Sequence, residues 1–293
     1  MYYFIVNPIA GNGRCPGIMD SMAKILRERS VEFDVASTEY PGHAEQLAQQ
    51  AAASGCHAVV AVGGDGTVME AAAGILKAGG NTALGIIPGG TGNDYRHSLG
   101  IPTDVSGALE VLLNSAPRQV DAGLFNGKPF FNIGSVGFDV SVVEESLRIR
   151  SLGKLSYYAA VFTTLVRYRS RKMRLWLNGV LEEKEMLLTA IGNGMFYGSG
   201  MKVLPKAKPE DGSFDVLVVD KIPPHKIAML FPQFPSGGHE KFPFVKFYRC
   251  EKVVLDAGGE PFTVQTDGEL HRGVTSAEFM VLPGALRVLA PAL

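Results

Sequence analysis

The sequence predicts an α/β N-terminal domain, a parallel sheet with helices on both faces, followed by a larger β-rich, sandwich-like C-terminal domain. Up to about residue 120, strand-like and helical segments alternate, which is typical of a parallel sheet covered on both faces. Beyond it, short strand-like runs follow one another between Gly, Asn and Asp, which favours an antiparallel sandwich. We therefore expect domains at residues 1–120 and 121–293, with the active site in the cleft between them. The last ten or so residues are expected to pack back on the first domain.

Apolar runs and periodicity define the expected N-terminal elements. Ile18, Met22, Ile25 and Leu26 recur at helical spacing, and short apolar runs that end at Gly, Pro or Asn are typical of buried strands. The expected strands are residues 2–8, 32–38, 58–62 and 83–88. The expected helices are residues 18–30, 43–54, 105–115 and the Ala-rich stretch after Thr67.

The C-terminal part shows closely spaced strand patterns. One helical stretch, about Ser151 to Arg169, interrupts them. The expected strands are residues 119–125, 129–138, 173–179, 185–193, 213–220, 252–257, 262–270 and 278–284.

Composition excludes several classes of protein. The net charge of −1 gives no reason to expect a nucleic-acid partner. The three cysteines are scattered without metal-ligand spacing, which argues against disulfides and zinc and favours a reducing compartment. The N-terminus shows no signal peptide, and the apolar run from Leu155 to Val166 is shorter than the roughly 20 residues that span a bilayer. We therefore expect a cytoplasmic protein.

The charge is nevertheless uneven along the chain. Residues 146–181 contain no Asp or Glu, and aromatic residues are interleaved among their bases. Two interpretations stay open, a solvated face with buried aliphatic stems and a surface for anionic lipid. The eight bases are Arg148, Arg150, Lys154, Arg167, Arg169, Arg171, Lys172 and Arg174, and the aromatic residues are Tyr157, Tyr158, Phe162 and Tyr168.

Two glycine-rich loops carry the chemistry. "GGDGT" at residues 63–67 and "PGGTGND" at residues 88–94 each follow a strand, and each contains a hydroxyl and a carboxylate. A helix N-terminus suits phosphate, but a carboxylate repels phosphate unless a metal ion or a proton lies between them. The loops therefore predict a phosphate site that also handles Mg²⁺ or a hydroxyl proton. The alternative is a pair of tight turns in which Asp caps a helix. Walker A, G-x-G-x-x-G and protein-kinase catalytic-loop motifs are absent.

Four motifs in this order resemble the diacylglycerol kinase catalytic-domain family. They are "VVAVGGDGTV", "GIIPGGTGND", "GNGMFYGSGMKVLPKAKPEDGSFDV" and "QTDGEL". The family includes bacterial diacylglycerol and lipid kinases and sphingosine kinases, and NAD kinases share "GGDGT". The resemblance implies an ATP- and Mg²⁺-dependent lipid kinase that phosphorylates a lipid hydroxyl, with diacylglycerol converted to phosphatidic acid. Two alternatives are an NAD kinase and a catalytically inactive lipid- or nucleotide-binding regulator.

The resemblance also implies roles for individual residues. Asp65, Asp94 and Asp121 match carboxylates that organise Mg²⁺-ATP. Asp211, with the carbonyl groups of Lys208 and Ser213, matches a structural Mg²⁺ site, for which a plain Asp-Gly turn is the alternative. The ATP-binding positions would be Asn7, Thr38, Gly63, Gly64, Asp65, Gly66, Thr67, Val68 and Thr91.

The general base is expected to be Glu269, with Asp65 as the alternative. Glu269 follows a turn in the second domain, where an acceptor hydroxyl would enter, and the resemblance gives the Glu of "DGE" the proton-acceptor role. Asp65 is better placed to bind Mg²⁺ or its waters, and a nearby Mg²⁺ would lower the basicity of its carboxylate. We therefore place both residues in the catalytic machinery, with Asp65 as the organiser of Mg²⁺-ATP.

The sequence departs from the family pattern at three places. Tyr95-Arg96-His97 stands where the family has Phe-Ala-Arg, Ser199 replaces a usual Gly, and Leu270 replaces a Pro. An Arg one residue early points about 100° away on a helix, so no phosphate or lipid role is carried to Arg96.

The expected partner is a lipid at a membrane surface, which the protein would contact peripherally at the inner membrane face. The basic segment and residues 226–247 are the candidate contacts, although residues 226–247 fit a core helix and strand equally well. The oligomeric state is open, and a homodimer is one candidate.

Overall fold

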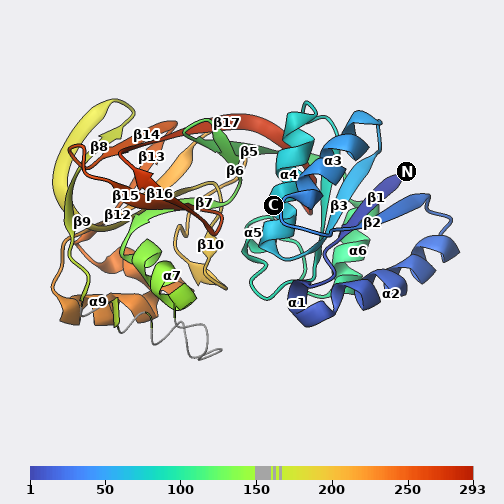
Figure 1. Ribbon diagram of the computed structural model, residues 1–293, viewed down its shortest axis with the longest axis horizontal. Coiled ribbons are helices and arrows are strands. Elements are labelled where there is room, and N and C mark those ends of the chain that lie inside the picture. Colours follow the sequence, from blue (N-terminus) through green and yellow to red (C-terminus); the bar gives the residue numbers. More distant parts are fainter. Residues whose placement is uncertain (149–159, 161–162, 165–166, 293) are drawn as a thin grey trace.

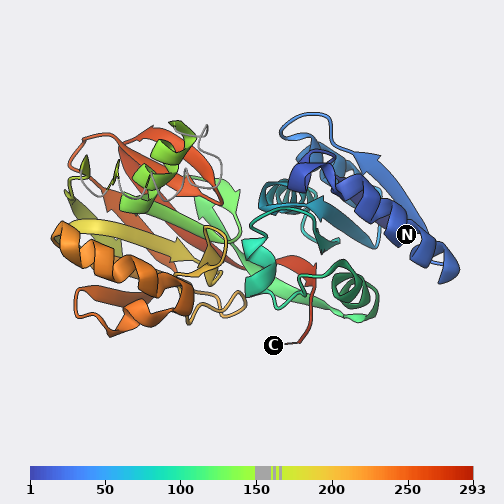
Figure 2. The ribbon, with the colours of Figure 1, turned by 90° about the horizontal axis from the view of Figure 1, so that it is seen from below.

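The computed structural model describes residues 1–148, 160, 163–164 and 167–292 in two domains that lie side by side (Figures 1 and 2). The first has parallel strands between helices and the second is mostly strand, which confirms the predicted fold class. The basic residues Arg150 and Lys154, the aromatic residues Tyr157, Tyr158 and Phe162, and most of the expected helix at 151–169 lie outside the described residues.

The N-terminal sheet consists of four parallel strands in the order β4-β3-β1-β2. Two of its sequences, "AVVAVG" and "ALGIIP", are buried at every position, as expected of strands covered on both faces. The strands are β1 (Tyr2–Val6), β2 (Phe33–Ser37), β3 (Ala58–Gly63) and β4 (Ala83–Pro88).

Helices cover both faces of this sheet, with α3 and α4 on one face and α2 and α6 on the other (Figure 1). Gly74 lets α3 and α4 approach closely, because a Cβ there would lie 2.2 Å from the carbonyl oxygen of Glu45. The helices are α1 (Ala10–Gly13), α2 (Cys15–Glu28), α3 (His43–Ala53), α4 (Asp65–Lys77), α5 (Asp94–Ser98) and α6 (Val105–Asn114).

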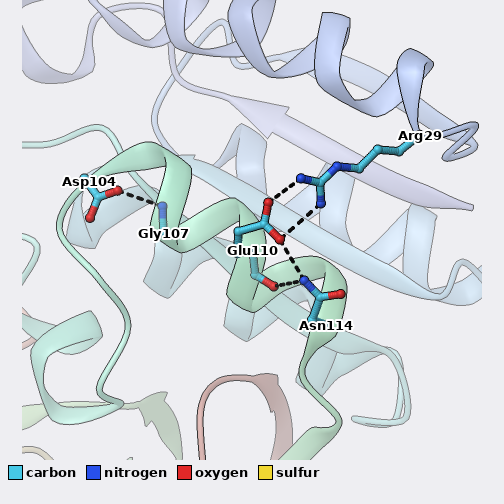
Figure 3. Close-up of polar contacts among 5 residues, drawn as sticks. All are labelled: Arg29, Asp104, Gly107, Glu110 and Asn114. Carbon is cyan, nitrogen blue, oxygen red and sulfur yellow. Dashed lines mark hydrogen bonds and ion pairs between the residues drawn. The ribbon is translucent and has the colours of Figure 1, made fainter.

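On the opposite face, polar contacts connect the end of α2 with α6 (Figure 3). Asp104 caps α6 by accepting the N–H of Gly107 at 2.7 Å. Arg29 forms a two-pronged ion pair with Glu110, which also accepts from Asn114. The Arg29 and Glu110 side chains are 44% and 48% exposed, so solvent screens the pair and it contributes little to stability.

The C-terminal domain is built around β9, a long strand that changes partners along its length. Its first half pairs with β8, and its second half pairs with β7 and β12. One apolar core lies between the resulting layers of strands, and a second lies between β7, β9 and β12 and the helices α7 and α9. The helices of this domain are α7 (Phe138–Arg148), α9 (Pro224–Leu230), η2 (Phe231–Ser236) and η3 (Gly238–Lys241). The strands are β5 (Pro117–Phe125), β6 (Lys128–Phe130), β7 (Ile133–Gly137), β8 (Arg171–Leu177), β9 (Val180–Gly192), β10 (Phe196–Tyr197), β11 (Met201–Lys202), β12 (Phe214–Asp220), β13 (Val245–Cys250), β14 (Lys252–Asp256), β15 (Phe262–Thr266), β16 (Glu269–Val274) and β17 (Ser276–Leu289).

Several elements differ from the sequence-based expectation. The short helices α1, α5 and α9, the helix α7 and the strands β10, β11 and β13 were not among the expected elements. The expected strand at 262–270 is divided between β15 and β16, and the expected strand at 129–138 is divided between β6 and β7. The division between β6 and β7 is caused by a contact with a residue distant in the chain, because the N–H groups of Phe131, Asn132 and Ile133 all bond to the carboxylate of Asp267 rather than to a neighbouring strand.

A ribbon of β5 and β17 joins the two domains. Residues 279–282 of β17 pair with residues 122–125 of β5, and residues 286–289 pair with residues 117–120. The register shifts between these two parts, and beyond the shift β17 also pairs in parallel with β4 of the N-terminal sheet. The end of the chain therefore packs against the first domain (Figure 1).

Asp121 clamps this ribbon at the register shift. Its carboxylate is 2% exposed and accepts the N–H of Gly284 and the N–H of Gly212, each at 2.8 Å. Both donors would be left without this acceptor if the carboxylate were removed.

We predict that Asp121→Ala lowers the free energy of unfolding by about 2–4 kcal/mol, because two N–H groups lose a charged acceptor. Asp121→Asn, which keeps one acceptor oxygen, should lose less. Urea unfolding without nucleotide or Mg²⁺ measures both effects. Unchanged stability of Asp121→Ala under these conditions would contradict a structural role.

Candidate active site

The two glycine-rich loops pack backbone against backbone. The N–H groups of Gly89 and Gly90 donate to the carbonyl oxygen of Gly63 at 2.7 and 3.0 Å. A Cβ on Gly90 would lie 2.3 Å from the Cα of Gly64, closer than real Cβ atoms come. Glycine is therefore required for contact between the loops, in addition to any role in admitting a ligand.

Two residues that sequence analysis did not assign hold the second loop in place. Arg14 donates to the carbonyl oxygens of Gly89 and Gly90 at 3.0 and 2.7 Å. Asn93 closes the loop on itself, since its side chain accepts the N–H of Gly90 at 3.0 Å and donates to the carbonyl oxygen of Gly90 at 2.9 Å. Asn93 adopts a φ of 53°, which Asn tolerates better than most residues, so the "GND" sequence carried a usable signal.

The helix α4 offers an anion-binding N-terminus. Only Gly64 separates it from β3, and its first turn has no side-chain cap among the described residues. Gly66 faces open space, because a Cβ there would meet nothing within 4 Å. Unpaired N–H groups at the start of a helix suit phosphate.

The other predicted ATP positions surround this N-terminus. Asn7, Thr38 and Thr91 follow β1, β2 and β4, and Gly63 is the last residue of β3. All four therefore share the carboxyl edge of the sheet, where ligands bind in such folds. Asn7 donates to the Thr67 hydroxyl at 3.0 Å.

Three of these positions are less accessible than the others. Gly63 is buried, the side chains of Thr67 and Val68 are buried, and the N–H of Val68 bonds to Gly64 within the turn. Asn7, Thr38 and Thr91 keep partly or fully exposed positions. Contact with ATP at any of these residues stays a prediction.

The carboxylates of Asp65 and Asp94 converge beside Gly92. A Cβ on Gly92 would lie 3.0 Å from Asp65 Oδ2, 3.6 Å from Asp94 Oδ2 and 3.7 Å from the hydroxyl oxygen of Ser199. Asp65 Oδ1 accepts the N–H of Tyr95 at 3.1 Å. Asp94 accepts the N–H groups of Ser199 and Gly200 at 2.8 and 2.7 Å, so it binds backbone from the second domain.

The charge of this pair favours a cation. Burial, followed by the nearby charge of Asp65, raises the pKa of Asp94, although two backbone N–H groups oppose the shift. Arg96 does not bind either carboxylate in the structure; its guanidinium donates to the carbonyl oxygen of Ile101 at 2.9 Å and contacts His97. No cluster of three or more His, Cys, Asp or Glu side chains suited to a metal occurs in the described part of the chain. Two carboxylates still fit Mg²⁺, which takes few protein ligands and keeps waters or phosphate oxygens.

Asp121 and Asp211 have hydrogen-bond partners of their own, none of them shared with Asp65 and Asp94 within the described residues. Asp121 is held at the ribbon between the domains, so its participation in a Mg²⁺-ATP network stays a prediction. Asp211 accepts the N–H of Ser213 at 3.3 Å and forms an ion pair with Arg249.

An unpaired carboxylate next to Asp211 fits a hard cation. Asp215 is 5% exposed, and its Oδ2 has no hydrogen-bond partner among the described residues. Burial first, and the charge of Asp211 in addition, raise the pKa of Asp215 to about 6, while Arg249 opposes the shift. Carboxylate oxygens suit Mg²⁺, but Arg249 competes for Asp211, so the structural metal at Asp211, Lys208 and Ser213 stays a prediction.

Within the "DGE" turn, Asp267 is the residue with contacts that connect it to the site. Asp267 accepts three backbone N–H groups at 2.7, 3.0 and 3.1 Å. Burial raises its pKa to about 6, and Asp65 contributes to the same shift. Sequence analysis assigned Asp267 no role, although an Asp before Gly with a φ of 49° is a recognisable turn. Glu269 is exposed at the start of β16, and its role as base stays a prediction.

A cavity of about 650 Å³ lies in the C-terminal domain. Phe262 of β15 lines it, and the other end of β15 leads into the "DGE" turn. Charged residues line the cavity as well: Glu144, Glu145, Arg148, Arg167, Arg169 and Arg171. Further apolar lining residues are Val136, Val140, Met173, Met186, Leu187 and Leu188.

We predict that the protein without divalent cations loses stability as pH rises from about 4 to about 6. The folded pKa of Asp215 lies above its ordinary value of 3.8, so folding favours the neutral form, and this contribution is lost as the group ionises. Asp215→Asn should remove about 2–3 kcal/mol of this pH dependence. Urea unfolding in a chelator across this range provides the measurement.

Mg²⁺ provides the control for this prediction. A cation at Asp211 and Asp215 would stabilise the ionised wild type at neutral pH, and Asp211→Ala should abolish that increase. Equal pH dependence of the wild type and Asp215→Asn, with no effect of Mg²⁺ on either, would refute both expectations.

Two family models match this chain. The model described as "Diacylglycerol kinase catalytic domain" matches residues 1–125, and the model described as "YegS C-terminal NAD kinase beta sandwich-like domain" matches residues 132–290. A solved structure of a diacylglycerol kinase from Bacillus anthracis str. Sterne superimposes with a TM-score of 0.76 at 23% identity, covering 99% of this chain and 96% of that chain, which shows the same fold.

Sequence relatives agree with the models. The diacylglycerol kinase of Mycobacterium tuberculosis is 31% identical over 295 residues, 98% of this chain and 94% of the relative. A Pseudomonas aeruginosa protein named "Probable lipid kinase YegS-like" is 34% identical over 269 residues, 91% of this chain and 87% of the relative. These matches confirm the resemblance carried by the four motifs. The chain belongs to the diacylglycerol kinase family of lipid kinases, phosphotransferases that act on a lipid alcohol.

Proposed function

We propose that this protein is an ATP- and Mg²⁺-dependent kinase that converts diacylglycerol to phosphatidic acid. One observation carries the proposal. The carboxylates of Asp65 and Asp94 both lie beside Gly92, and Asp65 is the first residue of α4, so a cation held by the two carboxylates would be next to a helix N-terminus suited to phosphate.

The residues suggest how the transfer would proceed. Mg²⁺, when bound, would neutralise phosphate charge, and Asp65 and Asp94 would hold it. The N–H groups at the start of α4 would bind and orient the phosphates. The lipid hydroxyl oxygen would attack the γ-phosphorus while the bond to the bridging oxygen of ADP breaks, and Glu269 would accept the hydroxyl proton.

The C-terminal cavity supports a lipid acceptor. The strand β15 runs from Phe262 at the cavity to Thr266 just before the turn that carries Glu269. Four residue steps of a strand span about 13 Å, a distance that an acyl chain can bridge. The diacylglycerol kinase relatives favour diacylglycerol as the substrate.

Peripheral membrane contact is part of the proposal. Three bases of the basic segment are paired in space, with Arg148–Glu145 at 3.5 Å, Lys172–Glu183 at 2.9 Å and Arg174–Asp256 at 2.5 Å. The attraction to anionic lipid would therefore come from fewer charges than the sequence contains. None of the helices in the described ranges is long and apolar enough to cross a bilayer.

Residues 226–247 offer a second contact surface, although most of their apolar side chains are in the core. Leu230 and Phe234 are 1% and 4% exposed, as in a core helix, whereas Met229 is 60% exposed. Lys226 and Lys241 lie over the rings of Phe244 and Phe242, which combines positive charge with partly exposed aromatic surface.

The function is tested with labelled ATP and purified protein. Mixed micelles would offer diacylglycerol, ceramide, sphingosine or phosphatidylglycerol, and NAD would be offered in parallel. We expect Mg²⁺-dependent labelling of diacylglycerol above all others. Labelling of NAD alone would make the protein an NAD kinase, and labelling of no acceptor would favour an inactive regulator.

We predict that Glu269→Gln lowers turnover by about 10²–10⁴-fold with near-normal nucleotide binding, because it removes only the proton acceptor. Asp65→Asn should instead weaken nucleotide binding in Mg²⁺ and shift the Mg²⁺ dependence of the rate. Steady-state rates and calorimetric binding measure these effects. If Glu269→Gln turns over normally with saturating lipid, Asp65 becomes the candidate base.

We also predict binding to anionic vesicles that weakens with salt. Each unpaired base near an anionic surface contributes about 1 kcal/mol, and added salt screens the attraction. Sedimentation with neutral and anionic vesicles at two salt concentrations measures it. Equal, salt-insensitive binding to both vesicle types would show that charge is not the cause.

A further inference from the structure

Ser199 adopts a backbone conformation that favours glycine. Its φ is 67°, and its neighbours Gly198 and Gly200 have φ values of 63° and 100°. A residue with a Cβ pays about 1 kcal/mol or more in this region, whereas glycine does not. The Ser199 hydroxyl makes no hydrogen bond to the part of the chain that the structure describes, so the fold gains no visible compensation from it. A strained residue whose side chain makes no stabilising contact is a candidate for a functional role.

The hydroxyl of Ser199 lies at the carboxylate pair. The point beside Gly92 that is 3.0 Å from Asp65 Oδ2 and 3.6 Å from Asp94 Oδ2 is 3.7 Å from Ser199 Oγ. The backbone N–H of Ser199 also donates to Asp94 Oδ2 at 2.8 Å, which fixes the side chain's origin relative to the carboxylate. Two carboxylate oxygens and the Ser199 hydroxyl oxygen are therefore gathered beside Gly92.

The segment that carries Ser199 is anchored in both domains. The N–H of Met195 donates to the Ser98 hydroxyl of α5 at 2.9 Å. On the other side, Asn132 donates to the carbonyl oxygen of Phe196 at 2.8 Å, and the Tyr197 hydroxyl donates to Asp139 at 2.9 Å. Figure 1 shows β10 of this segment on the side of the C-terminal domain that faces α5. The backbone next to Ser199 is thus held between the two domains.

We propose that Ser199 supplies a third oxygen to the divalent-cation site formed by Asp65 and Asp94, binding the cation or one of its waters. Mg²⁺ prefers oxygen ligands and usually retains waters, so a neutral hydroxyl beside two carboxylates matches its chemistry. Ser199 is a positioning residue, and the inference rests on the proposed Mg²⁺-dependent function.

Two substitutions separate the hydroxyl from the strain. Ser199→Gly removes both, and Ser199→Ala removes the hydroxyl but keeps the Cβ. Without cation, Ser199→Gly should melt about 2–4 °C above the wild type, and Ser199→Ala should melt close to it. With a non-hydrolysable ATP analogue, both variants should bind Mn²⁺ about 3–10-fold more weakly than the wild type, measured by electron paramagnetic resonance. The same factor should appear in the Mg²⁺ concentration needed for half-maximal turnover.

Asp65→Asn is the matched control for cation binding. If Asp65→Asn weakens Mn²⁺ binding while Ser199→Gly and Ser199→Ala bind as the wild type does, the Ser199 inference is overturned and the proposed function stands. Weakening in Ser199→Gly alone would assign the effect to backbone flexibility and would also overturn the inference. If the wild type and Asp65→Asn bind Mn²⁺ equally, the proposed cation site itself is wrong.

Discussion

The bond between Asp94 and the backbone of Ser199 and Gly200 is the constraint on which the site depends. Asp94 belongs to the N-terminal domain, and its acceptor oxygens bind N–H groups from the C-terminal domain at 2.8 and 2.7 Å. The same buried carboxylate faces Asp65, and burial and that proximity raise its pKa. Docking of the two domains and the charge of the candidate cation site are therefore coupled through a single side chain.

Several features of the fold and site could be predicted from the sequence because their causes are local. The buried strands β3 and β4 follow from uninterrupted apolar runs, and the glycine loops follow from glycines placed directly after those strands. The helix α4 could be expected from the Ala-rich stretch after Thr67. The two-domain architecture could be expected from the change in strand spacing along the chain, and the strands of the structure show the same change.

The rest depends on contacts between residues that are distant in the chain. Asp267 divides the expected strand at 129–138 by taking its N–H groups, and no periodicity reveals an acceptor more than a hundred residues away. Ser199 reaches the carboxylates only because its segment folds against α5. Charge patterning alone could not show that two bases of the basic segment pair with Glu183 and Asp256 on neighbouring strands, because both acids lie outside that segment of the chain.

The return of β17 to the first domain has a consequence for biosynthesis. Arg287 and Val288 pair with Ala83 and Leu84, so the edge of the N-terminal sheet is completed by residues that are synthesised long after β4. The first domain can form β1 to β4 early, but its β4 edge stays open until β17 has been synthesised. Such long-range pairing is slow, and an open strand edge invites aggregation in the interval. The β4 edge of the nascent chain is therefore exposed for longer than it would be if the first domain were completed by its own residues alone. Chaperones that shield strand edges would act in that interval.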